Sequence, residues 1–354
     1  MKGLVLSGGK GTRLRPFTYT GAKQLVPLAN KPVLFYVLED LVASGISDIG
    51  IVVGDTASQI EAAAGDGSAF GCTLTYIPQQ FPGGLAHAVR AGRPFLGDDR
   101  FVMYLGDNFV QGGIAARVKE FESSDAAARL LLYRVPNPQD FGVAELEDGK
   151  IIGVEEKPSD PKSDLALVGI YFFDSRIHRA TEAIEPSWRG ELEITDAIRF
   201  LLSDGQNIEA HTLDGWWIDT GKMEDMLDAN RLVLQELERR IDGNVKADCT
   251  VQGNVVVEAG AEVESSTLRG PLIIGSGTHI QRSYIGPFSA VAANCRIVDS
   301  ELEHAIVMQG TEILDVPYRI EDSLIGRDVT VYRSHAKPKA SKLVLGDHSK
   351  VGVI

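Results

Sequence analysis

The chain has 354 residues, a formal net charge of -14 and three cysteines that are far apart in the sequence. Its length favours two domains, because a single hydrophobic core seldom grows beyond about 250–300 residues. The acidic balance argues against general binding to nucleic acids or membrane surfaces, and no apolar run approaches the roughly 20 residues of a membrane helix. Since there is also no CxxC pair and no recognisable signal peptide, we expect a cytoplasmic protein with reduced thiols.

The first predicted element is a buried strand at residues 2–6, and a glycine-rich segment follows it directly. Because glycine has no Cβ, this segment can turn sharply and bring backbone N–H groups close to a ligand. Lys10, Arg13 and Arg15 lie in or beside it and Lys23 follows soon after, so the region predicts an anion site suited to nucleotide phosphates. The segment matches neither the Walker loop nor the dinucleotide fingerprint. It reads Leu6-Ser7-Gly8-Gly9-Lys10-Gly11-Thr12-Arg13-Leu14.

Strands and helices are predicted to alternate up to about residue 214. The apolar spacing indicates strands at 49–53, 73–77, 101–105 and 129–135, and helices at 31–44, 56–64, 85–93 and 114–123. Such alternation predicts an α/β fold with a mostly parallel, Rossmann-like sheet and helices on both faces. Ligands of such sheets bind beyond the carboxyl ends of the strands. The glycine-rich segment and Asp107 both follow predicted strands, which places them at that end.

The next segments predict a hairpin, a further strand and a connecting helix. Asp148-Gly149 separates two strand-like runs at 142–146 and 151–155, which is a strong hairpin signal. Residues 165–173 predict another strand. Residues 223–240 predict an amphipathic helix, so a linker helix at about 222–240 is expected to join two domains, residues 1–240 and 241–354.

Beyond residue 241 the apolar pattern changes to a step of about six residues. This hexapeptide repeat predicts a parallel β-helix whose apolar side chains point into the coil. The uneven spacing between Ile297 and Ile325, together with Pro317 and Pro338, predicts loops or interruptions of the coil. Leu345-Gly346 is one of several pairs that punctuate the repeat. The repeated positions are Val245, Val251, Val257 and Val263, then Leu268, Ile274 and Ile280, then Ile285, Val291 and Ile297, and finally Ile325 and Val331.

Several segments together resemble the signature of the sugar-1-phosphate nucleotidylyltransferases, and in particular the glucose-1-phosphate thymidylyltransferases. The repeat-rich final third is similar to the long form of that family, in which a left-handed β-helix follows the catalytic domain. The matching segments, in the family's order, are Gly8–Leu14, Lys23–Pro27, Leu105–Asn108, Glu155–Pro158, Arg189–Asp196 and Trp217–Gly221.

The resemblance implies Mg²⁺-dependent, in-line transfer of dTMP from dTTP to α-D-glucose 1-phosphate, giving dTDP-glucose and pyrophosphate for deoxysugar biosynthesis. This reaction needs alignment and charge neutralisation, and no covalent protein nucleophile. The implied catalytic cations are Arg13 and Lys23 on the triphosphate and Lys157 and Arg189 on the sugar phosphate. The implied Mg²⁺ ligands are Asp107 and Asp219, since a hard cation on phosphates prefers a few carboxylates plus water. A plain turn aspartate would also suit Gly106-Asp107-Asn108 without any metal.

The resemblance also implies the base and sugar contacts. Gln79 matches the family's glutamine on the thymine edge, and Gly84 matches the point where the backbone meets the base. Three departures concern the choice of base and sugar, because Ser7, Gly83 and Phe141 stand where many relatives carry Ala, Asp and Tyr. The implied nucleotide-binding residues are Leu6, Gly8, Gly9, Gly11, Thr12, Gln24, Gln79 and Gly84, and the implied sugar-binding residues are Gly142, Glu156 and Leu167.

Other functions remain open at this point. The same chemistry with UTP or another hexose 1-phosphate is the nearest alternative. A bifunctional acyltransferase would use a histidine of the β-helix as general base, for which His279, His304 and His335 are available. A non-catalytic regulatory paralogue is a third alternative, although the cations and carboxylates of the signature are present. We expect the β-helix to support a homo-oligomer, of a size the sequence leaves open.

Overall fold

The computed structural model describes residues 1–9, 11–19 and 21–336. They form two compact units. The first unit consists of Met1–Gly11, Gly21–Val26 and Pro32–Thr220, and the second consists of Thr12–Thr20, Pro27–Lys31 and the chain from Gly221 onward. No helix among the described residues is both long and apolar enough to cross a membrane.

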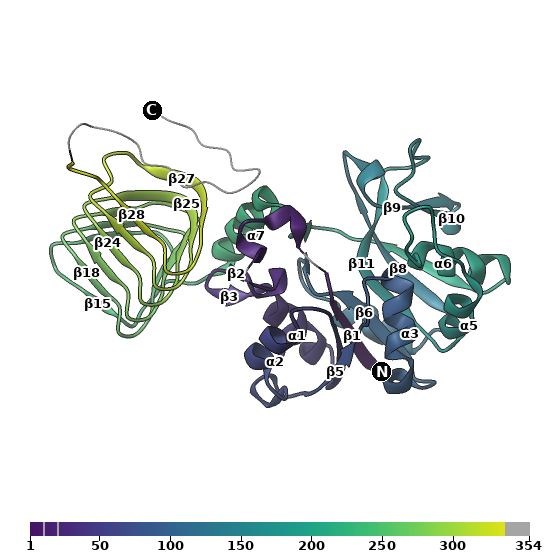
Figure 1. Cartoon of the computed structure of the whole chain (residues 1–354). Coiled ribbons are helices and arrows are strands. Elements are labelled where there is room, and N and C mark those ends of the chain that lie inside the picture. Colours follow the sequence, from purple (N-terminus) through teal and green to yellow (C-terminus); the bar gives the residue numbers. More distant parts are fainter. Residues whose placement is uncertain (10, 20, 337–354) are drawn as a thin grey trace. The chain divides into compact units, whose positions relative to one another are not determined.

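The first unit is built on a mixed sheet with the strand order β10-β9-β11-β6-β1-β4-β5, to which β8 and β12 are joined beside β11 (Figure 1). Strands β5, β4, β1 and β6 run parallel to one another, and β12 runs parallel to β8. Strand β11 is antiparallel to both β6 and β8, and the β9–β10 hairpin extends the sheet beyond it. The strands are β1 Lys2–Ser7, β4 Asp48–Val53, β5 Thr73–Pro78, β6 Phe101–Leu105, β8 Ala128–Arg134, β9 Gly142–Glu147, β10 Lys150–Glu156, β11 Leu165–Phe173 and β12 Ile208–Thr212.

Helices cover both faces of this sheet, as the alternating pattern predicts. Leu4 and Leu6 of β1 lie in one buried cluster with α3, α5 and α6, whereas Val5 lies in another with α1, α2 and α4. This division follows from the period of two, since successive side chains of a strand point to opposite faces. The helices are α1 Val33–Ala43, α2 Ala57–Ala64, α3 Leu85–Leu96, α4 Ala115–Glu122, α5 Arg176–Ala183 and α6 Ile194–Ser203.

The predicted elements of this unit are all confirmed in type, with shifts at their ends. Helix α3 runs through Pro94 to Leu96, three residues beyond the predicted end. Helices α5 and α6 and strand β12 were not predicted. A small sheet of β7 Asn108–Val110 and β13 Trp217–Asp219 was also missed, since each strand has only three residues. Short elements complete the description: η1 Thr12–Leu14, η2 Phe17–Tyr19, η3 Lys23–Leu25, η4 Ser68–Phe70, η5 Pro138–Asp140, β2 Pro27–Leu28 and β3 Lys31–Pro32.

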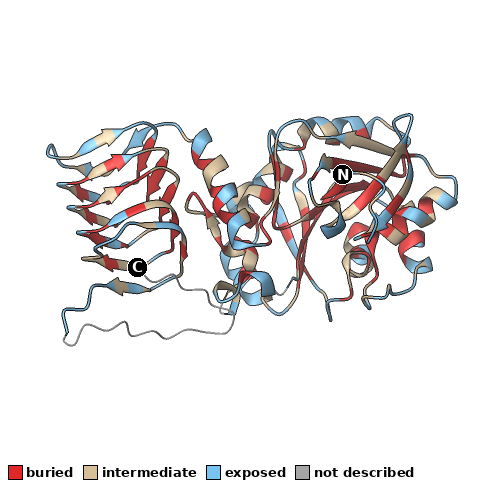
Figure 2. Cartoon of the chain, turned by 90° about the horizontal axis from the view of Figure 1, so that it is seen from above, coloured by how far each residue is buried: buried red, intermediate tan, exposed pale blue. Residues whose placement is uncertain are grey.

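The second unit contains helix α7 and the parallel β-helix that the repeat predicts. Strands of successive coils pair in parallel, for example Val255 with Leu272 and Leu272 with Ser289. Figure 2 shows the buried residues concentrated along the stacked coils. The repeated positions from Val257 to Ile297 are fully buried in one core. The elements are α7 Met223–Glu236, β14 Arg240–Ile241, β15 Asn244–Val245, β16 Thr250–Gln252, β17 Val255–Val257, β18 Glu262–Glu264, β19 Thr267–Arg269, β20 Leu272–Ile274, β21 His279–Gln281, β22 Tyr284–Ile285, β23 Ser289–Val291, β24 Arg296–Val298, β25 Glu301–Val307, β26 Glu312–Leu314, β27 Ile320–Ile325 and β28 Thr330–Tyr332.

One expectation for this unit is confirmed in part and another needs correction. Residues 315–319, which include Pro317, form a loop as expected, but the coil continues from Ile297 to Leu314, because β25 and β26 extend the stack and Leu302, Val307 and Ile313 are fully buried in its core. The steps there are five residues at two places, which disguised the repeat. Helix α7 ends at Glu236, four residues before the predicted end. Pro317 lies between β26 and β27, whereas Pro338 and Leu345-Gly346 lie outside the described residues.

Within the second unit, Asn230 joins α7 to the β-helix. Its side chain is completely buried. The Asn230 Oδ1 accepts a hydrogen bond of 2.8 Å from the backbone N–H of Ala29, and its Nδ2 donates to the carbonyl of Phe288 at 3.0 Å. Asn30 Nδ2 donates to the carbonyl of Val291 at 2.8 Å. These bonds fasten the segment at residues 27–31 and helix α7 to β23.

Candidate functional site

The carboxyl ends of three parallel strands meet at one edge of the sheet in the first unit. Ser7 of β1 pairs with Val53 of β4, and Leu6 pairs with Leu105 of β6. The N–H of Gly106 donates to the carbonyl of Leu6 at 3.0 Å, so the Gly106-Asp107 turn lies against the start of the glycine-rich segment. A Cβ atom at Gly106 would lie 2.8 Å from Ser7 Oγ, closer than side chains pack. Glycine at this position therefore allows the turn to approach β1.

Lys23 and Asp107 meet at this edge. The Lys23 ammonium forms an ion pair with Asp107 Oδ2, and their side chains are 16% and 9% exposed. Lys23 begins η3, and its Cε lies 3.4 Å from the position of a Cβ atom on Gly9. The ammonium thus lies beside the glycine-rich segment and the carboxylate, as a phosphate-binding lysine requires.

Asp219 lies next to Asp107 through the small β7–β13 sheet. Asp219 of β13 pairs with Asn108 of β7, directly after Asp107. Thr220 holds the carbonyl of Asp107 twice, by its N–H at 3.0 Å and its hydroxyl at 2.8 Å. The two aspartates, far apart in sequence, are therefore carried on neighbouring backbone segments. Two carboxylates near the glycine-rich segment are a hard oxygen donor set of the kind that fits Mg²⁺.

Gln79 lies beside Gly8, and Gly84 lies beside Gln79. Gln79 Oε1 is 2.9 Å from the position of a Cβ atom on Gly8, so this glycine is required for the approach. Gln79 Nε2 is 3.3 Å from the carbonyl oxygen of Gly84 and 3.0 Å from Nδ1 of His87. Gly84 has a φ of 97°, and a Cβ there would lie 2.5 Å from the carbonyl oxygen of Leu192, so no other residue fits.

The implied sugar-binding residues also lie together. Gly142 pairs with Glu156 across the hairpin. A Cβ at Gly142 would lie 3.0 Å from Leu167 Cδ1, 3.1 Å from Glu156 Oε2 and 3.1 Å from Thr195 Cγ2. Thr195 is completely buried, and its hydroxyl has no hydrogen-bond partner among the described residues. Burial raises the pKa of Glu156, and the nearby Glu193 carboxylate raises it further.

Two cations flank this group. Lys157 directly follows Glu156 and has a φ of 43°, a left-handed conformation that a non-glycine residue seldom adopts outside constrained sites. Arg189 is shared among three carboxylates, at 3.3 Å from Glu193, 3.4 Å from Glu156 and 3.5 Å from Glu191. Its guanidinium is thus held in place by Glu156, one of the implied sugar-binding residues, and by the two glutamates of its own loop.

Backbone contacts connect the two groups within the first unit. Gly169 of β11 approaches Asn108, since a Cβ atom at Gly169 would lie 3.1 Å from Asn108 Cγ. Leu167 lies two residues earlier on the same strand. The N–H of Leu192 donates to the carbonyl of Gly83 at 2.8 Å, which ties the base-side loop to the loop of Arg189. The structure therefore brings the implied metal, base and sugar residues of this unit to one region.

Three implied residues lie differently from the rest. Gln24 is only 1% exposed and Leu6 is 8% exposed, so both side chains are buried beneath the surface of the first unit. Gly11 has a φ of 60°, as a tight turn requires. Lys10 lies outside the described residues.

Thr12 and Arg13 belong to the second unit. Arg13 Nη2 is 2.9 Å from the position of a Cβ atom on Gly221, so the guanidinium occupies the space that this glycine leaves open. Burial raises the pKa of Asp225, near the start of α7, and the Arg13 charge opposes that rise. Arg13 is therefore directed toward the beginning of α7.

Sequence reasoning missed Thr195, Thr220 and His87. Thr195 and Thr220 both lie inside the motifs that carried the resemblance, so their position was a usable signal. His87 gave no signal, because nothing in its spacing distinguishes it from other residues in the first turn of α3.

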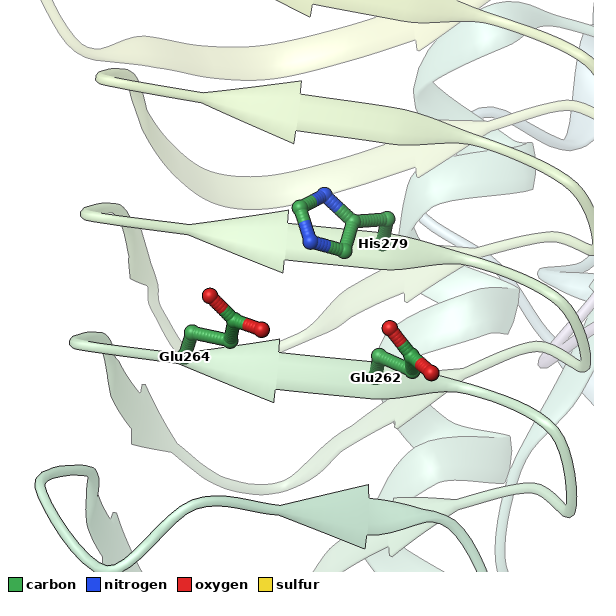
Figure 3. Close-up of side chains that lie close together, drawn as sticks. All are labelled: Glu262, Glu264 and His279. Carbon is green, nitrogen blue, oxygen red and sulfur yellow. The ribbon is translucent and has the colours of Figure 1, made fainter.

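Several titratable side chains of the β-helix lie close to one another. Figure 3 shows Glu262 and Glu264 on β18 beside His279 on β21. A carboxylate oxygen of each glutamate and a ring nitrogen of the histidine lie within 4.8 Å of one another. Glu264 already accepts a hydrogen bond of 3.2 Å from Gln281, and Glu262 is exposed. His304 is paired with Asp322 at 2.6 Å, and His335 with Asp315 at 2.9 Å. Polar ladders of this kind are expected where parallel strands stack in register.

Comparison with known proteins identifies clear relatives. The family model described as nucleotidyl transferase matches residues 2–236. The chain is 56% identical to a glucose-1-phosphate thymidylyltransferase of Streptomyces griseus, over 100% of the chain and 99% of the relative. It is 45% identical to the low-salt glycan biosynthesis nucleotidyltransferase Agl11 of Haloferax volcanii, over 99% of both chains. A crystal structure from Bacillus anthracis, described as a glucose-1-phosphate thymidylyltransferase with sucrose bound, has a TM-score of 0.62 at 39% identity and covers 66% of this chain and 94% of its own.

Proposed function

We propose that this chain transfers dTMP from dTTP to α-D-glucose 1-phosphate. The chain belongs to the nucleotidyl transferase family and, within it, to the glucose-1-phosphate thymidylyltransferases. The products are dTDP-glucose and pyrophosphate, and the expected role is in deoxysugar biosynthesis. The observation that carries the proposal is the meeting of Lys23, Asp107 and Asp219 at the carboxyl end of β1 and β6. Full-length similarity to thymidylyltransferases supports the choice of substrates.

The reaction consists of one in-line displacement. An oxygen of the glucose 1-phosphate attacks the α-phosphorus of dTTP, a new P–O bond forms, and the bond to the departing pyrophosphate breaks. Lys157 and Arg189 hold the attacking phosphate, whereas Arg13 and Lys23 hold the triphosphate and offset the charge that develops on pyrophosphate. Alignment and charge compensation of this kind supply most of the rate in phosphoryl transfer.

Asp107 and Asp219 are the proposed ligands of a magnesium ion. When bound, Mg²⁺ supplies positive charge at the phosphate oxygens. The fit rests on the donor set, because two carboxylates on the paired segments β7 and β13 leave positions for water and phosphate. Asp107 also pairs with Lys23, which indicates that a cation is stabilised at this place.

The test is pyrophosphate release from dTTP, UTP, dCTP and dATP, each with glucose 1-phosphate and with other hexose 1-phosphates, in the presence and absence of Mg²⁺. We expect the highest kcat/KM for dTTP with glucose 1-phosphate and no turnover after chelation. Preference for UTP or another hexose 1-phosphate would correct the substrates and keep the chemistry. Absence of pyrophosphate release with every pair would refute the function.

The remaining proposals concern organisation. We assign residues 1–240 to catalysis and 241–354 to the β-helix, which we propose as an assembly module of a cytoplasmic homo-oligomer. The exposed first coil supports this, since Ile241 at its end is 38% exposed and open ends of stacked coils favour pairing or capping. Size measurement of the intact chain in solution tests it, and a monomer at assay concentration would contradict it.

A further inference from the structure

The amide of Gln79 is held in a single orientation by two neighbours. One of its terminal atoms is 3.3 Å from the carbonyl oxygen of Gly84 and 3.0 Å from Nδ1 of His87. A backbone carbonyl only accepts hydrogen bonds, so the atom facing it must be the NH₂ group. That NH₂ group only donates, and His87 Nδ1 must therefore accept, with the ring proton on Nε2.

His87 is built to remain in this neutral form. It lies in the first turn of α3, where Phe81 packs on its ring with centroids 4.4 Å apart. Burial lowers the pKa of His87, and the charge of Arg90 lowers it further. A Cβ on Gly83 would lie 2.9 Å from the ring, so this glycine allows the imidazole to lie where it reaches Gln79.

The orientation of the amide decides what the other end of Gln79 presents. Oε1 lies on the Gly8 side and accepts no hydrogen bond from any described residue. The N–H of Gly84 donates to no acceptor in the described part of the chain. One acceptor beside one donor complements the N3–H and O4 of thymine or uracil. Cytosine presents N3 as acceptor and N4–H₂ as donor. The acceptor Oε1 of Gln79 would then face an acceptor, and the N–H of Gly84 would face a donor.

We propose that His87 is a positioning residue that fixes the Gln79 amide and so selects an imide base, thymine or uracil, over cytosine. This inference rests on the proposed function, because it places the base of the nucleotide against Gln79 and Gly84. Without His87, only the longer contact to Gly84 opposes rotation of the amide. A rotated amide presents NH₂ to the base and removes the distinction.

Two variants separate the acceptor of His87 from its ring. His87→Phe keeps an aromatic ring against Phe81 and removes the acceptor. His87→Asn removes the ring and keeps a carbonyl oxygen near the position of Nδ1. Both variants and the wild type are assayed by pyrophosphate release with dTTP, UTP and dCTP, and their thermal unfolding is recorded to confirm that each is folded.

For His87→Phe we expect KM for dTTP to rise about fivefold, the factor that an ordinary hydrogen bond supplies. The kcat and the KM for glucose 1-phosphate stay unchanged, and the preference for dTTP over dCTP in kcat/KM falls by at least the same factor. His87→Asn retains the wild-type preference within about twofold. A folded His87→Phe enzyme with unchanged base preference overturns the inference, as does equal loss in both variants. Wild-type protein that turns over neither dTTP nor UTP instead refutes the proposed function.

Discussion

Replacing Arg189 by alanine should lower the stability of the folded chain as well as its turnover of glucose 1-phosphate. The Arg189 guanidinium lies between Glu156 at 3.4 Å and Glu193 at 3.3 Å, and the Glu193 side chain is only 5% exposed. Its removal leaves Glu193 without this cation partner, whereas the charge of Lys157 still acts on Glu156. Breaking a fully buried pair costs about 3–5 kcal/mol. Because the Arg189 side chain is 25% exposed, solvent relieves part of this, and we expect a loss on the order of 2 kcal/mol.

The assay is the urea midpoint of unfolding, followed by fluorescence, for three proteins. Arg189→Ala should unfold at clearly lower urea than the wild type. The double variant Arg189→Ala with Glu193→Gln should recover most of that difference, because the neutral amide no longer repels Glu156. Ser187 Oγ donates to Glu193 at 2.8 Å and can keep a partner in the amide oxygen.

Turnover should separate from stability in the same proteins. Both variants lack the cation proposed for the sugar phosphate, so kcat/KM for glucose 1-phosphate should be about 10²–10³ lower in both. Equal midpoints for Arg189→Ala and the wild type would refute the electrostatic reasoning. Wild-type turnover in the stabilised double variant would refute the catalytic role of Arg189.

Four further outcomes are expected. Asp107→Asn should lower pyrophosphate release by about 10²–10³, whereas the control Glu262→Gln with Glu264→Gln, which removes carboxylates of the β-helix, should leave it unchanged. The pKa of Glu156 is raised by burial and by Glu193, so Glu156 becomes protonated at a higher pH than an ordinary glutamate. The kcat/KM for glucose 1-phosphate should fall as the Glu156 carboxylate is protonated, and the pH profile of Glu156→Gln should lack this decrease on the acidic side. Thr220→Val removes the hydroxyl bond to Asp107 and should cost about 1 kcal/mol in urea unfolding. Ile280→Ala in the β-helix core should cost about 2–5 kcal/mol in the same measurement.

The α/β sheet and the β-helix could be predicted because both depend on periodic burial. Strand β1 alternates between two cores, and the six-residue step marks one side chain per coil face. The prediction failed where the period was broken or too short to read. The five-residue steps after Ile297 concealed the continuation of the coil up to Leu314, and the three-residue strands β7 and β13 gave no periodic signal.

The candidate site was predictable only as far as its motifs reached. The adjacency of Asp107 and Asp219 follows from pairing of β7 with β13, which no local pattern in either strand announces. His87 and Thr195 act through the direction of a side chain, and residue spacing does not determine that direction. The shared position of Arg189 among three acids likewise depends on how the loop before α6 packs against the hairpin.

Two of the four cations proposed to bind phosphates are paired with carboxylates, so in a chain of net charge -14 these cations are held in place before the polyanions bind. Lys23 is paired with Asp107, and Arg189 with Glu193 and Glu156. Each carboxylate fixes its cation in direction at the cost of local positive charge. Because Lys23 is engaged until Asp107 takes another cation, Lys23 and Asp107 should act as a unit, and the losses of activity in Lys23→Ala and Asp107→Asn should add to much more than the loss in the double variant.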